Sequence, residues 1–220
     1  MHSKREAQPS MGAIAVAAAA LVWLQVAMLG YLLYLGLLGA VLMALVVGSP
    51  AALASHRLML RARSRCLRMS VMMLAAGGFG MLAGCIADLG QVGLYGMLAL
   101  CRGAAPSWFD ARQWWAVMTL TPWTYLGMLG GGTAGMAWLD AAHGRRLPIL
   151  GRVALYGFCD LSMVMGMLLV EHWVALLSTD VAPTMGGVLM VASMLAGMGA
   201  GMAASYRLGT GLVWRRGAVN

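Results

Sequence analysis

An uncharged run near the start of the chain limits its fold more than any other feature. Residues 11–54 are 44 consecutive residues without Asp, Glu, Lys or Arg. The hydrocarbon core of a bilayer is ~30 Å thick, so a helix needs ~20 apolar residues to cross it. This run therefore has the length of two membrane spans. A secretory signal has an apolar core of only ~7–15 residues, so we interpret the run as a retained part of the protein.

The composition of the whole chain supports the same class. Hydrophobic residues make up 61% of its 220 residues and charged residues 10%, against about 45–50% and about 25% in soluble domains. In lipid, helices satisfy every backbone polar group internally, whereas a β-barrel would show alternating segments of ~10 residues. The sequence therefore predicts an all-α, polytopic transmembrane helix bundle with no separate soluble domain.

We predict about six spans in this bundle. The run 11–54 forms either two spans with a turn near Gly30 and Tyr31 or one long tilted helix. The outer segment 89–112 contains an apolar piece too short to cross, which either lies in the interface or re-enters the membrane. Pro122 is expected to kink the fourth span. The approximate spans are 12–29, 33–53, 69–88, 113–139, 153–177 and 184–206.

Basic residues are distributed unevenly between the two sides of this model. Of the 15 Lys and Arg, 13 lie in the termini and in two loops on one side, and only Arg102 and Arg112 lie on the other. Lys and Arg are enriched in short cytoplasmic loops. We therefore expect both ends of the chain to be cytoplasmic in a bacterial-type inner membrane, with lipid as the main partner. This asymmetry accounts for the net charge of +8, and nucleic-acid binding is not expected because no basic run is interleaved with aromatic residues.

Glycines recur at four-residue spacing within the predicted spans. Such spacing places them on one face of a helix, where small residues let two helices approach closely. We interpret these faces as packing surfaces inside the bundle; the alternative is a surface for a second copy of the chain or for another membrane subunit. The residues are Gly80, Gly84, Gly127, Gly131, Gly135, Gly197 and Gly201.

A short pattern built on Gly, Met and Leu also recurs. It occurs at residues 80–84, 127–131 and 193–197, with a looser version at 166–168. The pattern indicates either duplicated helices, as in repeat-built transporters, or chance similarity in a chain with 30 Gly and 21 Met.

The fifth predicted span carries a stripe of acids and thioethers. Asp160, Met163, Met167 and Glu171 are spaced three, four and four residues apart, which places them within ~80° of one another around a helix. A charge at membrane depth costs about 2.5–3.5 kcal/mol on insertion scales, so such acids usually face a cavity or a partner. Asp160 lies deeper than Glu171 and His172, which are either solvated near the outer surface or part of the same path.

The sixth predicted span adds Met194 and Met198 to this thioether content. Thioethers are soft ligands that suit copper(I), but methionine is also a flexible filler of apolar cores, and both interpretations stay open. Asp88, at the outer end of the third span, either caps a helix or marks the mouth of a path. Cys85 and Cys101 could pair only in an oxidising outer compartment.

Two functions are consistent with these features. The first is a transport or permeation protein for a cation, with a soft metal such as copper as one candidate. The alternative is a non-catalytic accessory or assembly subunit that docks through its glycine faces. We do not expect an enzyme, because no HExxH, GxSxG, Walker or GxGxxG motif occurs in the required context. The proposed path comprises Asp160, Met163, Met167, Glu171, His172, Met194 and Met198.

Overall fold

The computed structural model describes residues 9–33, 35–103, 111–142, 149–177 and 192–202. All regular secondary structure in these ranges is helical, which confirms the predicted all-α class. Within the same ranges, four helices are long and apolar enough to cross a membrane. They are Met11–Leu32, Gly36–Arg61, Leu67–Gly93 and Ile149–Val170.

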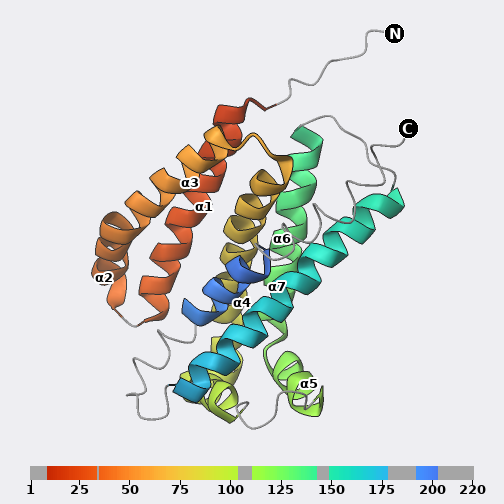
Figure 1. The fold of residues 1–220 in the computed structure, drawn as a ribbon. Helices are drawn as coiled ribbons and strands as arrows, with labels where there is room; N and C mark the ends of the chain where they lie inside the picture. Colours follow the sequence, from red (N-terminus) through yellow and green to blue (C-terminus); the bar gives the residue numbers. More distant parts are fainter. Residues whose placement is uncertain (1–8, 34, 104–110, 143–148, 178–191, 203–220) are drawn as a thin grey trace, which may run out of the picture.

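The first two helices form an antiparallel hairpin from the uncharged run (Figure 1). Helix α1 spans Met11–Leu32, and Gly36 adopts a left-handed φ of 69° at the turn, a conformation that glycine adopts without strain. The two helices approach closely just above the turn, because a β-carbon on Gly30 would lie 2.8 Å from the Cα of Ala40. The turn therefore follows Leu32, and Gly30 and Tyr31 lie in the last turns of α1.

The second arm of the hairpin is one continuous helical segment in three parts. These parts are α2 (Gly36–Met43), a π-helical turn η1 (Ala44–Gly48) and α3 (Ser49–Arg61). Helix α3 extends into the arginine-rich segment that we expected to be a loop.

Helix α4 (Arg65–Gly103) is longer than the predicted third span and changes direction within its length. Gly93 has φ 72° and ψ 162°, which interrupts the helix. The apolar piece that we expected to lie in the interface or re-enter the membrane is therefore helical and follows this break. The break itself depends on a residue that tolerates positive φ.

The predicted fourth span is wrong as a single kinked helix. Its first part is α5 (Ala111–Leu120), and its second part is a separate helix, α6 (Pro122–Ala142), which lies at an angle to α5 (Figure 1). Proline has no N–H to donate but fits the first turn of a helix, where that donor would have no intrahelical partner. Pro122 therefore begins a helix here. Helix α6 has 21 residues but is not among the four candidate spans.

The last described elements are α7 (Ile149–Leu177) and a helical segment, residues 192–202. In Figure 1, α4 and α6 run side by side through the middle, with the hairpin on one side and α7 crossing obliquely on the other. The predicted sixth span, 184–206, includes residues outside the described ones at both of its ends.

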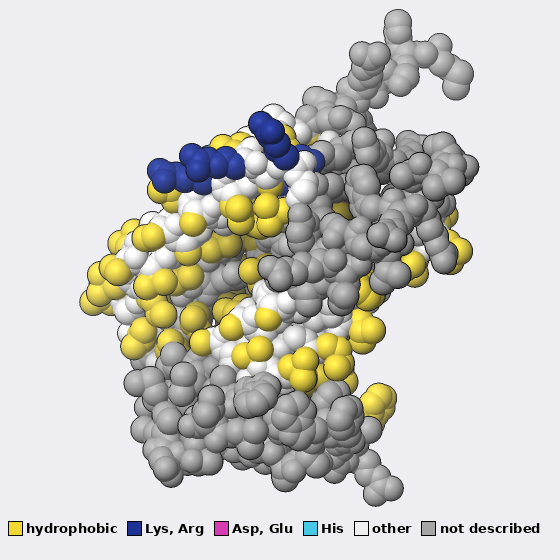
Figure 2. All heavy atoms as spheres, viewed as in Figure 1, with side chains coloured by type: hydrophobic (Ala, Val, Ile, Leu, Met, Phe, Trp, Pro, Cys, Tyr) yellow, Lys and Arg dark blue, Asp and Glu magenta, His cyan; other side chains and the backbone are white. Residues whose placement is uncertain are grey.

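Polarity is arranged on the surface as expected for a membrane protein. Leu37, Leu38 and Leu150 are 79%, 75% and 82% exposed, respectively. Figure 2 shows basic side chains gathered at one end of this face, with hydrophobic side chains over the body. In α3, both Arg57 and Arg61 are exposed at that end. The apolar outside fits a lipid environment.

Candidate functional site

Glycines bring two pairs of helices into backbone contact, and the first pair is α4 with α6. A β-carbon on Gly80 would collide with the carbonyl oxygen of Gly127, and one on Gly127 would collide with that of Gly80. One turn away, a β-carbon on Gly131 would collide with the carbonyl oxygen of Ala76. At the other end of the contact, one on Gly84 would lie 2.6 Å from the backbone nitrogen of Thr124.

The second pair is α7 with the segment 192–202. A β-carbon on Gly166 would collide with the carbonyl oxygen of Gly197, and the reverse also holds. One turn further, a β-carbon on Gly201 would collide with the carbonyl oxygen of Ser162.

Gly135 of α6 belongs to the first pair, since its β-carbon would lie 2.8 Å from the Cβ of Ala76 in α4. All seven predicted packing glycines therefore lie at contacts within this chain.

Each glycine at the closest approach of a pair precedes a methionine of the interior. Met81, Met128, Met167 and Met198 follow Gly80, Gly127, Gly166 and Gly197, and all four methionines are 0% exposed. In the sequence, one version of the recurring pattern occupies residues 193–197. In the structure, the glycine–methionine pair equivalent to the other three is Gly197 and Met198, four residues after the start of that version. In all four helices, the residue that follows the contacting glycine is therefore a buried methionine.

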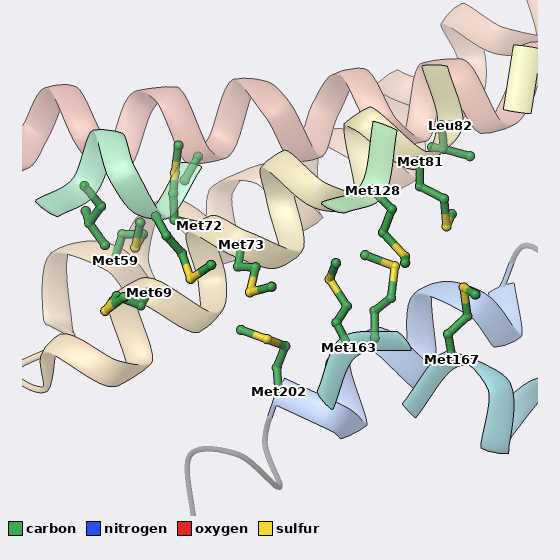
Figure 3. Close-up of a cluster of buried hydrophobic side chains, with 14 of the residues drawn as sticks. Met59, Met69, Met72, Met73, Met81, Leu82, Met128, Met163, Met167 and Met202 are labelled. Carbon is green, nitrogen blue, oxygen red and sulfur yellow. The ribbon is translucent and has the colours of Figure 1, made fainter. Parts of the chain in front are cut away.

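The interior enclosed by these helices consists largely of methionine (Figure 3). We call the twelve methionines that are buried within the described part of the chain the thioether core. They are Met59, Met69, Met72, Met73, Met81, Met128, Met136, Met163, Met167, Met194, Met198 and Met202. Four of the seven predicted path residues, Met163, Met167, Met194 and Met198, belong to it.

Met163 reaches from α7 into the groove between α4 and α6. A β-carbon on Gly77 of α4 would lie 3.4 Å from its sulfur, and one on Gly132 of α6 would lie 3.5 Å from its terminal methyl. Met73 occupies the same region, because the Gly132 β-carbon would lie 3.3 Å from its Cγ and from its Cε. Gly77 and Gly132 therefore leave the space that the two thioethers fill.

Asp160 lies one helical turn from Met163 and is half-buried between α6 and α7. Its Oδ2 accepts a hydrogen bond of 3.0 Å from the hydroxyl of Thr133, the residue after Gly132. Its Oδ1 is buried and has no hydrogen-bond partner among the described residues. Among the described residues, only Oδ2 of this carboxylate is hydrogen-bonded. Oδ1 is therefore an available acceptor one helical turn from Met163 of the thioether core.

A second acid lies on the same α6–α7 interface, nearer the arginine end. Asp140 is 6% exposed and accepts a hydrogen bond of 2.7 Å from the Tyr156 hydroxyl. The predicted span 113–139 ends just before Asp140, but α6 continues to Ala142 and buries it. Asp140, Asp160 and Met163 therefore follow one another along the interface from the charged end into the interior.

A third acid, Asp88, caps α6 from α4. It is fully buried and accepts hydrogen bonds from the backbone N–H groups of Trp123 and Thr124, at 3.2 and 2.7 Å, and from the Thr124 hydroxyl, at 2.6 Å. The first N–H groups of a helix lack intrahelical partners, and its N-terminus favours a negative charge. Asp88 therefore caps the N-terminus of the neighbouring helix α6 rather than the end of its own helix, and it is buried.

Cys85 lies buried beside this cap. The hydroxyl of Thr124 lies 3.4 Å from its sulfur. The disulfide that we considered also needs Cys101, whose side chain lies outside the described ones, so this pairing stays a prediction.

Sequence reasoning missed Gln25, the polar residue that attaches the hairpin to the rest of the bundle. Its side-chain amide is buried in α1 and donates to the carbonyl oxygens of Leu74, at 2.9 Å, and Ala75 of α4. Gly78 leaves the room for it. A single glutamine inside an uncharged run could have indicated this contact from the sequence, because such residues often hydrogen-bond between membrane helices.

The structure describes the backbone but not the side chains of two predicted path residues. Glu171 and His172 lie in α7, but their side chains are outside the described ones. Elsewhere in the described chain, no group of three or more His, Cys, Asp or Glu side chains could hold a metal ion.

Comparison with protein-family models, with curated proteins and with solved structures finds no match to this chain. The fold and the polarity of its surface define the class: an all-helical protein suited to a membrane. Its function has to be inferred from the geometry of its own residues.

Proposed function

We propose that this protein is a transport or permeation protein whose substrate is a soft monovalent cation, with copper(I) as the candidate. The observation that carries the proposal is the thioether core, together with the spare carboxylate oxygen of Asp160 at its edge. Thioethers are neutral and soft, so they bind copper(I) and have little affinity for Mg²⁺ or Ca²⁺, which prefer oxygen ligands.

The order of groups along α6 and α7 supports a transport path rather than a closed storage site for the cation. Asp140 and Asp160 lie toward the arginine end, the thioether core follows, and Asp88 lies at the opposite end of α6. Acids at the entrance concentrate cations, and soft ligands farther in select among them. By the positive-inside rule the arginine end faces the cytoplasm.

The accessory-subunit alternative depended on glycine faces that would dock onto another protein. Those glycines pack against helices of the same chain. The alternative therefore lacks the feature that suggested it, although it stays a prediction. It would be favoured if the purified protein were stable only together with another membrane subunit.

The test measures copper in cells that express the protein. Copper content and copper tolerance are compared for wild type, an empty vector, Asp160→Asn and the double variant Met163→Leu with Met167→Leu, at matched membrane levels. Met-to-Leu changes keep apolar volume and usually cost less than ~1.5 kcal/mol of stability, so they separate function from folding. We expect wild type to change copper content and both variants to reduce that change.

Two outcomes would count against this proposal. Wild type that behaves like the empty vector would contradict copper transport altogether. A wild-type effect that survives both variants would place the path away from Asp160, Met163 and Met167.

A further inference from the structure

We infer that Met73, Met163 and Asp160 form a binding site for one copper(I) ion where α4, α6 and α7 meet. This inference deepens the proposed function, on which it rests, by assigning the substrate to three named ligands. Each ligand is argued below from its own contacts.

The Met73 and Met163 side chains both approach the same glycine of α6. The position that a Gly132 β-carbon would occupy lies 3.3 Å from the terminal methyl of Met73 and 3.5 Å from that of Met163. Both side chains are 0% exposed and come from different helices. Gly77 adds to this space, since its β-carbon would lie 3.4 Å from the Met163 sulfur. A β-carbon at Gly132 would make a tight contact with Met73, and one at Gly77 would be in van der Waals contact with the Met163 sulfur.

The carboxylate is held by the residue of α6 that follows this glycine. Thr133 directly follows Gly132 and holds Oδ2 of Asp160 at 3.0 Å. Oδ1 is buried without a hydrogen-bond partner in the described residues, a costly state for a carboxylate oxygen. Simple packing of methionine would not require an acid here, whereas a bound cation would satisfy this oxygen.

The ligand set selects for one class of cation. Two neutral thioethers and one carboxylate make a site with a single negative charge, which a monovalent cation neutralises inside the bundle. Soft sulfur ligands favour copper(I) and its chemical analogue silver(I). Ca²⁺ takes six to eight oxygen ligands, and structural Zn²⁺ usually takes four from Cys, His and carboxylates. Neither ion fits this set.

The test uses the full-length protein purified in detergent, with silver(I) as a redox-stable probe. Isothermal titration calorimetry measures its affinity for wild type, Met73→Leu, Met163→Leu and Asp160→Asn. The matched control is Met165→Leu, which changes an exposed methionine of α7 that lies outside the thioether core. We expect one strong site in wild type and in the control, and an affinity loss of about tenfold or more in each ligand variant, at least the loss typical of altered metal sites.

A second measurement needs no variant and therefore decides even where a variant fails to fold. X-ray absorption of wild type loaded with copper(I) under reducing conditions should show two sulfur neighbours and one oxygen. A first shell of oxygen and nitrogen alone would overturn the site. Equal silver affinity of wild type and all three folded ligand variants would overturn it as well.

Failure of this site and failure of the proposed function give different results. Silver binding that needs Met163 and Asp160, with no copper phenotype in cells, would retain the site and contradict transport. A copper phenotype in cells, with silver binding insensitive to all three residues, would retain transport and reject this site.

Discussion

The carboxylate of Asp88 accepts both the backbone N–H and the hydroxyl of Thr124, at 2.7 and 2.6 Å, so that α4 supplies the N-terminal cap of α6. Asp88 also accepts the N–H of Trp123 at 3.2 Å. The sharp division between α5 and α6 is therefore supported from a third helix. The cap lies one turn from Gly84, where the two backbones meet closely.

Asp88→Ala should destabilise the protein by about 3 kcal/mol, because it leaves buried donors of α6 without their charged acceptor. Thermal unfolding of the purified protein measures the effect. Gln91→Ala, which changes an exposed side chain of the same helix, is the control and should unfold like wild type. Equal unfolding temperatures for the two variants would mean that the cap contributes little.

Gly131→Leu should destabilise the bundle by about 3 kcal/mol or more, because its side chain would enter the backbone of α4 at Ala76. Its neighbour provides a matched control, since a β-carbon on Gly130 would meet nothing within 4 Å. Yield and thermal stability of Gly131→Leu and Gly130→Leu are compared in the same detergent. Similar stability of the two variants would show that the glycine face does not hold α4 and α6 together.

Gly166→Ala should loosen the contact between α7 and residues 192–202, since its β-carbon would also lie 2.8 Å from the Cα of Gly201. Gly157→Ala on the same helix meets nothing within 4 Å, and it should be neutral or stabilise by about 0.5–1 kcal/mol. Hydrogen exchange of the peptide covering 158–170 should be faster only in Gly166→Ala. Unchanged exchange in both variants would contradict the backbone contact.

The predicted orientation is tested with reporter fusions. Fusions after Arg68, Arg146 and Arg216 should report the cytoplasm, and fusions near Ser107 and Asp180 should report the external side, because Lys and Arg favour cytoplasmic loops. An external signal after Arg68 would reject the model of six spans with both ends inside. The signals near Ser107 and after Arg146 together show whether the chain crosses at α5 and α6, and those after Arg146 and near Asp180 show whether it crosses at α7.

Local sequence patterns predicted the helical class and part of the candidate site. The uncharged run 11–54 required membrane helices, and the spacing of Asp160, Met163 and Met167 placed them on one face of α7. Both inferences depend on length and helical periodicity, which a single segment contains. The turn after Leu32 was displaced by a few residues because apolar residues continue through it.

Contacts between distant segments decided what those patterns left open. The sequence alone determined that the chain is apolar and helical and that glycines and methionines recur on shared faces of its helices. Only the tertiary structure decided that Gly80 meets Gly127, that Asp88 caps α6, and that Met73 joins Met163 over Gly132. The physical reason is that close backbone approach and buried hydrogen bonds need a partner on another helix, whose position no local periodicity contains.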